Sequence, residues 1–237
     1  YLGQECYDDL AEILRRKLEL HRDSEVSDTI EYRLGQVYQT KLSSIEQAIE
    51  YYKSILERRP EHQEAHDALR GLLDDDDYRI EASRVLESVY ERTEQNEKLC
   101  EMLEIQLADE SDVYGQVELL KRIAGIHQDK LTDYEAAFKD YARILKNSQD
   151  ECYVVQIEAL SEILNNTPEL VEVYKNVVQN VYEPDMQVSF NNKIADLVLN
   201  QIGDEAQAEH YYSAALEIQS DDAHSLDALD SIYTKRE

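Results

Sequence analysis

The sequence is poor in residues that interrupt helices. It has only 6 glycines and 3 prolines among 237 residues, and these two residue types are the least compatible with a helix interior. Leucine, glutamate, alanine, glutamine, lysine and arginine are plentiful, and all of them favour helices. This balance predicts an all-α chain.

Long apolar runs are also missing. The longest wholly apolar stretches span a few residues, whereas a helix that crosses a bilayer needs about 20. The sequence therefore predicts no direct membrane insertion.

Positive charge is scarce. Lysine and arginine together number 24 against 52 aspartates and glutamates, which gives a net charge of -28. Such a field repels phosphate backbones and anionic lipid surfaces. We therefore expect no nucleic-acid partner. Halophilic adaptation or a merely solvated helical surface are alternative explanations of the acidity.

The three cysteines, Cys6, Cys100 and Cys152, stand apart and form no CxxC pair. They are therefore interpreted as reduced packing residues rather than zinc or redox ligands. The chain does not begin with methionine, which suggests a segment of a longer protein. Its location stays open between the cytoplasm and the cell envelope.

Catalytic and metal-binding patterns are lacking too. No Ser/His/Asp or Cys/His set stands near a glycine-rich turn, and no phosphate-cradling loop appears. His62 and His66 lack a third ligand and are interpreted as exposed helix surface. The run from Asp74 to Asp77 lacks the glycine and the terminal glutamate of a calcium loop, so we expect it to cap the next helix. The sequence thus predicts no catalytic residue, no cofactor and no metal ion.

One block of sequence occurs three times without a gap. The copies run from Arg33 to Pro60, from Arg122 to Gln149 and from Lys193 to Ser220. Self-similarity at intervals of this size is typical of helical repeat proteins, in which each unit buries its apolar face against its neighbours.

Small and aromatic residues recur in a fixed order within these blocks. A small residue lets two helices approach closely, a second small residue lies at the crossing on the partner helix, and an aromatic ring fills the adjacent space. Each block is therefore predicted to be a packed antiparallel hairpin. The recurring residues are Gly35, Ala48, Tyr52 and Leu56, then Ala124, Ala137, Tyr141 and Leu145, then Ala195, Ala208, Tyr212 and Leu216.

Amphipathic helices flank each block on both sides, so the repeating unit has four helices. The first unit carries one additional helix, from Tyr78 to Gln95. We expect about thirteen helices in a single solenoid over residues 1–237, with units at roughly 7–95, 96–166 and 167–237.

The block resembles the tetratricopeptide repeat. The resemblance rests on LGxxY from Leu34 to Tyr38, AxxxY from Ala48 to Tyr52, and Pro60. It implies a right-handed α-solenoid of antiparallel hairpins. The family's tryptophan is absent, with Glu31, Leu120 and Asn191 in its place, and the loop within each hairpin is one residue longer than usual. The alternation of hairpin types is also similar to long tandem-repeat scaffold proteins of myxobacteria and related bacteria.

The resemblance also implies where a partner binds. In tetratricopeptide arrays the first helix of each hairpin lines a concave face. On this chain that face is predicted to include Tyr32, Gln36, Gln39, Glu64, Asp67, Asp74, Glu118, Lys121, Glu158, Glu162, Asn192, Asp196 and Asp227.

These positions are mostly acidic, which disfavours an acidic peptide tail as the ligand and favours partner proteins with basic patches. The predicted function is a non-catalytic scaffold for protein-protein interactions. The alternative is a regulatory or substrate-recruiting arm of a larger protein whose catalytic, DNA-binding or membrane domain lies outside this segment.

Overall fold

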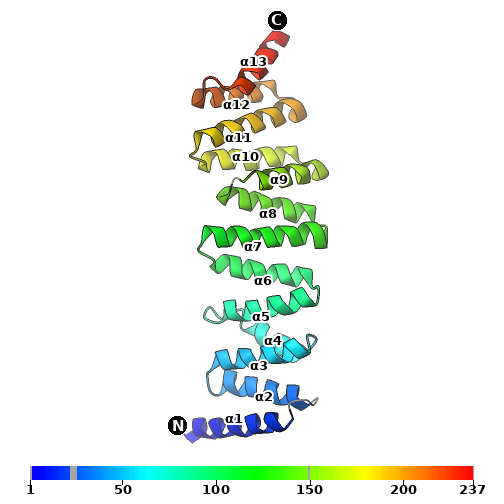
Figure 1. Ribbon diagram of the computed structural model, residues 1–237, viewed down its shortest axis with the longest axis vertical. Coiled ribbons are helices and arrows are strands. Elements are labelled where there is room, and N and C mark those ends of the chain that lie inside the picture. The colour runs from blue at the N-terminus through cyan, green and yellow to red at the C-terminus, as the bar shows by residue number, and fades with distance from the viewer. Residues whose placement is uncertain (1, 22–25, 149, 237) are drawn as a thin grey trace. The chain divides into compact units, whose positions relative to one another are not determined.

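The computed structural model describes residues 2–21, 26–148 and 150–236. Within these ranges the chain forms thirteen α-helices and no strand, which confirms the all-α prediction. From α1 to α6 and from α8 to α13, each helix packs against the next helix in the chain (Figure 1). No helix in the described ranges is both long and apolar enough to cross a membrane.

The chain divides into two units, and the boundary after Leu119 falls within helix α7. In unit 1, the closest packing occurs within the pairs α2 and α3, and α5 and α6. Helix α5 is the additional helix expected from the sequence. The helices of this unit are α1 (Leu2–Leu20), α2 (Val26–Thr40), α3 (Ile45–Arg58), α4 (Gln63–Gly71), α5 (Arg79–Arg92), α6 (Asn96–Asp109) and the first part of α7 (Val113–Ile126).

Unit 2 begins within α7 and ends with α13. Its closest packing joins α11 to α12, which form the hairpin of the third sequence block, and α8 to α9. The second block spans the end of α7, η1 and α8, and η1 packs against α8. Two π-helical segments extend α7 and α11. The remaining elements are η1 (His127–Leu131), α8 (Tyr134–Asn147), α9 (Glu151–Leu164), α10 (Thr167–Asn180), α11 (Pro184–Leu197), η2 (Val198–Ile202), α12 (Glu205–Ile218) and α13 (Ala223–Arg236).

The recurring small and aromatic residues form the core of each hairpin, as predicted. The second small residue of every copy is fully buried, and so is the ring of Tyr52. Tyr141 and Tyr212 are buried at the equivalent positions. The last leucine departs from the pattern in the third copy, where Leu216 is only half-buried. The three hairpins therefore share one packing scheme.

The additional residue in each hairpin loop is accommodated by a widened last turn of the first helix. In each copy a backbone N–H donates to the carbonyl six residues earlier: Ser44 to Tyr38, Asp133 to His127 and Asp204 to Val198. The residue before each of these donors has positive φ: 52° at Ser43, 51° at Thr132 and 82° at Gly203. One left-handed residue thus closes each hairpin turn.

The second helix of a hairpin begins with a carboxylate cap in two copies. Asp133 accepts a hydrogen bond from the backbone N–H of Ala136 at 2.9 Å, and Asp204 accepts one from Gln207 at 3.0 Å. Such caps satisfy N–H groups that have no partner within the helix. They fix the point at which the chain leaves the left-handed turn.

A buried charge cluster takes the place of the family's tryptophan in the first hairpin. Asp28 and Glu31 on α2 are both buried. Arg58 lies 2.9 Å from Asp28 and 2.7 Å from Glu31, and Arg59 lies 3.0 Å from Asp28. Burial alone would raise the pKa of Asp28, but the hydrogen bonds and charges of the two arginines outweigh it and lower that pKa. The cluster ties the start of α2 to the end of α3.

The interpretation of His62 and His66 as exposed helix surface is wrong. His66 is buried rather than exposed, stacks on Tyr90 with centroids 5.6 Å apart, and lies 2.6 Å from the Pro60 carbonyl oxygen. His62 is the N-cap of α4 and accepts the backbone N–H of Ala65. These contacts use both imidazoles for local structure.

The aspartate run from Asp74 to Asp77 does not provide the cap of α5. The N-cap is Tyr78, without a side-chain capping bond. Asp75 accepts the N–H of Asp77, and Asp76 pairs with Arg79 at the helix start. In the part of the chain that the structure describes, no group of three or more histidine, cysteine or carboxylate side chains could hold a metal ion.

The cysteines also differ from their interpretation as packing residues. All three are free, but only Cys100 is buried, whereas Cys6 and Cys152 are exposed. The thiol of Cys152 lies beside Asp150 at the start of α9. Local desolvation and the neighbouring carboxylate raise its pKa, which makes it a weak nucleophile.

Candidate protein-binding faces

The predicted binding residues fall into two sets, one in each unit. The face of unit 1 comprises Tyr32, Gln36, Gln39, Glu64, Asp67, Asp74 and Glu118. The face of unit 2 comprises Lys121, Glu158, Glu162, Asn192, Asp196 and Asp227.

In unit 1, Tyr32 connects the first helices of two successive hairpins. Its ring centroid lies 5.8 Å from that of Tyr52 and 5.9 Å from that of His62. The Tyr52 hydroxyl in turn donates to Oε1 of Gln39 at 2.9 Å. The packing of α2 and α3 thus positions two predicted face residues, Tyr32 and Gln39.

The polar residues of this face are mostly open to solvent. Gln36, Glu64 and Asp67 are exposed, and Asp67 accepts a hydrogen bond from Gln63 at 2.7 Å. Asp74 is exposed as well, but it lies in the turn beyond the end of α4 instead of on a helix face. Asp74 therefore lies outside the helical part of this face.

In unit 2, Glu158 joins three helices. It accepts hydrogen bonds from the Tyr174 hydroxyl on α10 and from Nζ of Lys193 on α11, both at 2.8 Å. Burial, together with the neighbouring carboxylate, raises the pKa of Tyr174 well above its usual value, so this hydroxyl stays protonated and donates. Glu158 is therefore a structural link as well as a face residue.

Asp196 has a similar position one hairpin further along. It accepts the Tyr212 hydroxyl at 2.6 Å and lies 3.0 Å from Nε2 of His224 on α13. Burial and the hydrogen bond to Asp196 raise the pKa of Tyr212. The core tyrosine of the third hairpin thus orients a carboxylate on the predicted face.

A third bridge joins α11 to the start of α13. Nδ2 of Asn192 donates to Asp222 at 2.9 Å, and its Oδ1 accepts the Ser225 hydroxyl at 2.7 Å. Asp222 also accepts the backbone N–H of Ser225 at 2.9 Å. Together with the Glu158 and Asp196 contacts, this bridge joins α9, α11 and α13 into one polar surface.

Two carboxylates of this surface point into solvent. Glu162 on α9 and Asp227 on α13 are exposed. Within the described residues, neither side chain has a hydrogen-bond or ion-pair partner.

Sequence reasoning missed Lys193, which sits beside Asn192 but outside the spacing used to assign the face. Its long side chain reaches Glu158 across 35 positions of sequence. The sequence signal that could have identified it is its place as a basic residue directly after Asn192, a predicted face residue. Lys193 neutralises part of the negative charge, and Asp196 is hydrogen-bonded to Tyr212 and His224, so the unpaired acidity of this face lies at Glu162 and Asp227.

Comparison with known proteins supports the repeat assignment. Residues 32–62, which span most of α2, all of α3 and the loop to α4, match the family model of the tetratricopeptide repeat. No curated protein matches the chain significantly in sequence.

Solved structures that match this chain include three tetratricopeptide proteins. The C-terminal part of a TPR repeat-containing protein from Cytophaga hutchinsonii is 14% identical, with 94% of each chain covered and a TM-score of 0.34. YrrB, described as a TPR protein with an unusual peptide-binding site, is 15% identical over 93% of this chain and 99% of its own, with a TM-score of 0.33. A thermophilic TPR protein of Thermus thermophilus is 18% identical over 85% and 98%, with a TM-score of 0.29.

The family match and the hairpin core coincide at the same residues, Tyr38, Ala48 and Tyr52. The chain is therefore an all-α helical-repeat protein that carries a tetratricopeptide repeat at residues 32–62.

Proposed function

We propose that this chain is a non-catalytic scaffold that binds partner proteins through the first helices of its hairpins. The observation that carries the proposal is the surface of unit 2, where side-chain bridges hold α9, α11 and α13 together. Helical repeats use such extended surfaces for protein recognition.

The partner is proposed to carry a basic patch. Lys193 and His224 are already paired with carboxylates, whereas Glu162 and Asp227 have no such partner in the described ranges. A net charge of -28 adds a long-range field of the same sign. Complementary charge speeds encounter and excludes acidic competitors. The same field disfavours nucleic acid and anionic membrane surfaces as partners.

Selection from a random peptide library on the whole protein tests this proposal. We expect the enriched peptides to carry net positive charge. Their affinity should fall roughly tenfold for the double variant Glu162→Lys and Asp227→Lys, because two attractive contacts become repulsive. Both residues are exposed, so the fold should survive the change.

The matched control reverses two exposed carboxylates on second helices, Glu135→Lys on α8 and Glu217→Lys on α12. It changes the net charge equally and should leave peptide affinity within about twofold. Enrichment of neutral or acidic peptides, or equal losses in the two double variants, would reject a specific acidic face.

A further inference from the structure

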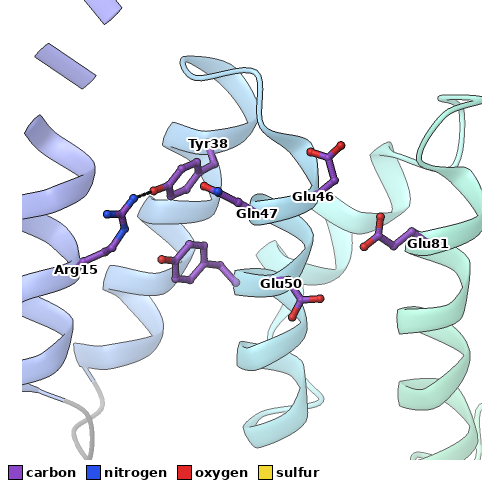
Figure 2. Close-up of a pocket in the computed structure, with 7 residues that line it drawn as sticks. Arg15, Tyr38, Glu46, Gln47, Glu50 and Glu81 are labelled. Carbon is purple, nitrogen blue, oxygen red and sulfur yellow. Dashed lines mark hydrogen bonds between the residues drawn. The ribbon is translucent and has the colours of Figure 1, made fainter. Parts of the chain in front are cut away.

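A cavity of about 460 Å³ lies in unit 1, away from the predicted binding face. Residues of α1, α2, α3 and α5 line it, whereas the helical residues of the predicted face of unit 1 lie on α2, α4 and α7. Figure 2 shows Arg15 approaching from α1 on one side and Glu81 pointing from α5 toward α3 on the other. The lining residues are Arg15, Tyr38, Glu46, Gln47, Glu50, Tyr51 and Glu81.

One wall of this cavity is aromatic. Tyr38 and Tyr51 stack with centroids 5.7 Å apart and an interplanar angle of 16°. The guanidinium of Arg15 lies 5.7 Å from the centre of the Tyr38 ring and donates to the Tyr38 hydroxyl. Stacking therefore holds the two rings in place, and the guanidinium of Arg15 lies against one of them.

The opposite wall is acidic and lacks a cation. Glu46, Glu50 and Glu81 are all exposed. Glu46 accepts a hydrogen bond from the Tyr78 hydroxyl at 3.4 Å. None of the three forms an ion pair with a basic side chain in the described part of unit 1. Arg15 is engaged with Tyr38, so the cavity holds three carboxylates against one guanidinium.

We propose that this cavity binds an arginine side chain of a partner polypeptide. The guanidinium can reach the carboxylates of Glu50 and Glu81 while the aliphatic stem packs on Tyr51. Carboxylates and tyrosine rings both attract guanidinium groups. A phosphate or carboxylate ligand would instead face three like charges. The volume greatly exceeds that of a water molecule and admits a long side chain.

A glycine–arginine peptide and its citrulline counterpart test the proposal, because citrulline keeps the shape of arginine and lacks its charge. Titration of the whole protein can be followed by NMR at the side-chain amide of Gln47, which lines the cavity. We expect the arginine peptide to shift these signals in a saturable manner and the citrulline peptide to leave them unchanged.

Variants separate the cavity from the general acidity of the protein. Glu50→Gln with Glu81→Gln should weaken the arginine peptide roughly tenfold. Glu57→Gln, at an exposed position of α3 outside the cavity, should not weaken it. Tyr51→Leu should weaken binding with the carboxylates intact. Equal binding of the citrulline peptide, or an undiminished affinity in the Glu50 and Glu81 double variant, would overturn the proposal.

The proposal is independent of the binding face of unit 2. The variant with Glu162→Lys and Asp227→Lys should leave the Gln47 response unchanged. Loss of the response in that variant as well would assign it to the overall charge and would also overturn the proposed cavity site.

Discussion

The ring of Tyr52 occupies the space that a β-carbon would take at position 35. A methyl group built on Gly35 would lie 2.8 Å from Cζ of Tyr52 and closer still to Cε1. The two equivalent hairpins place alanine at this position, so the first hairpin has the closest approach of helix backbone and tyrosine ring.

Gly35→Ala should therefore destabilise the protein by about 1 to 3 kcal/mol through overpacking, although alanine is the better helix former by about 1 kcal/mol. Urea unfolding measures the change. When Gly35→Ala is combined with Tyr52→Leu, the smaller side chain should remove the clash, so the double variant should lose less stability than the sum of the two single losses. Losses that simply add would contradict this explanation.

Gly125→Ala provides the opposite case. Gly125 lies in α7, and an added β-carbon there meets no atom within 4 Å. The substitution should stabilise the protein by about 0.5 to 1 kcal/mol because it lowers the backbone entropy of the unfolded chain. A loss of stability would show that this position is more tightly packed than the structure indicates.

Substitutions of the left-handed residue in two hairpin turns should have opposite effects on stability. Thr132→Gly should stabilise by about 1 kcal/mol, because a β-branched residue is strained at φ of 51°. Gly203→Ala should destabilise by a similar amount. Thermal unfolding compares the variants. Effects of the same sign at both positions would argue against a shared turn geometry.

The hairpins could be predicted from the sequence because their spacing repeats three times and links each small residue to one tyrosine. The left-handed turns could not, since only Gly203 indicates positive φ, whereas serine and threonine occupy the other two positions. The burial of His66 was missed because it depends on Tyr90 and Pro60, which the helical periodicity of α4 does not reveal.

Acid should destabilise the cluster around Asp28. Its pKa is lowered in the folded protein, so its contribution to stability is present above the unfolded value of about 3.9 and is lost as pH falls below it. Asp28→Asn should cost about 2 kcal/mol at neutral pH and flatten the loss of stability below pH ~4. Urea unfolding at neutral pH and below pH ~4 tests this, and Asp227→Asn at an exposed position is the control. An unchanged acid profile for Asp28→Asn would contradict the assignment.

Alkali should destabilise the packing around Tyr174. Its pKa is raised by burial and by Glu158, so its contribution is complete below the unfolded value of about 10 and is lost as pH rises above it. Tyr174→Phe should cost about 1 kcal/mol at neutral pH and reduce the steepness of alkaline unfolding. Tyr182→Phe, on a side chain that is 91% exposed, should do neither. Identical profiles for the two variants would reject a special role for Tyr174.

The predicted face was assigned from the positions of residues along each helix. The structure adds side-chain contacts between helices, which those positions do not reveal. Spacing along α9 and α11 does not show that Lys193 reaches Glu158, because that contact depends on the separation of the helices and on two side-chain rotamers. Glu158 consequently belongs to the framework of the face, and its reversal would test stability together with binding. Glu162 and Asp227 are better probes because they are exposed and lack such links.

The most direct test of the acidic binding face is the affinity of a library-selected peptide as a function of salt. At 0.1 M salt, exposed charges that are more than about 10 Å apart are largely screened from each other, and at 1 M salt this screening length falls to about 3 Å. We predict that Kd rises by roughly tenfold across that range for the native protein, and much less for the Glu162→Lys and Asp227→Lys variant, whose attractive charges are gone. A Kd that is indifferent both to salt and to these substitutions would contradict the account.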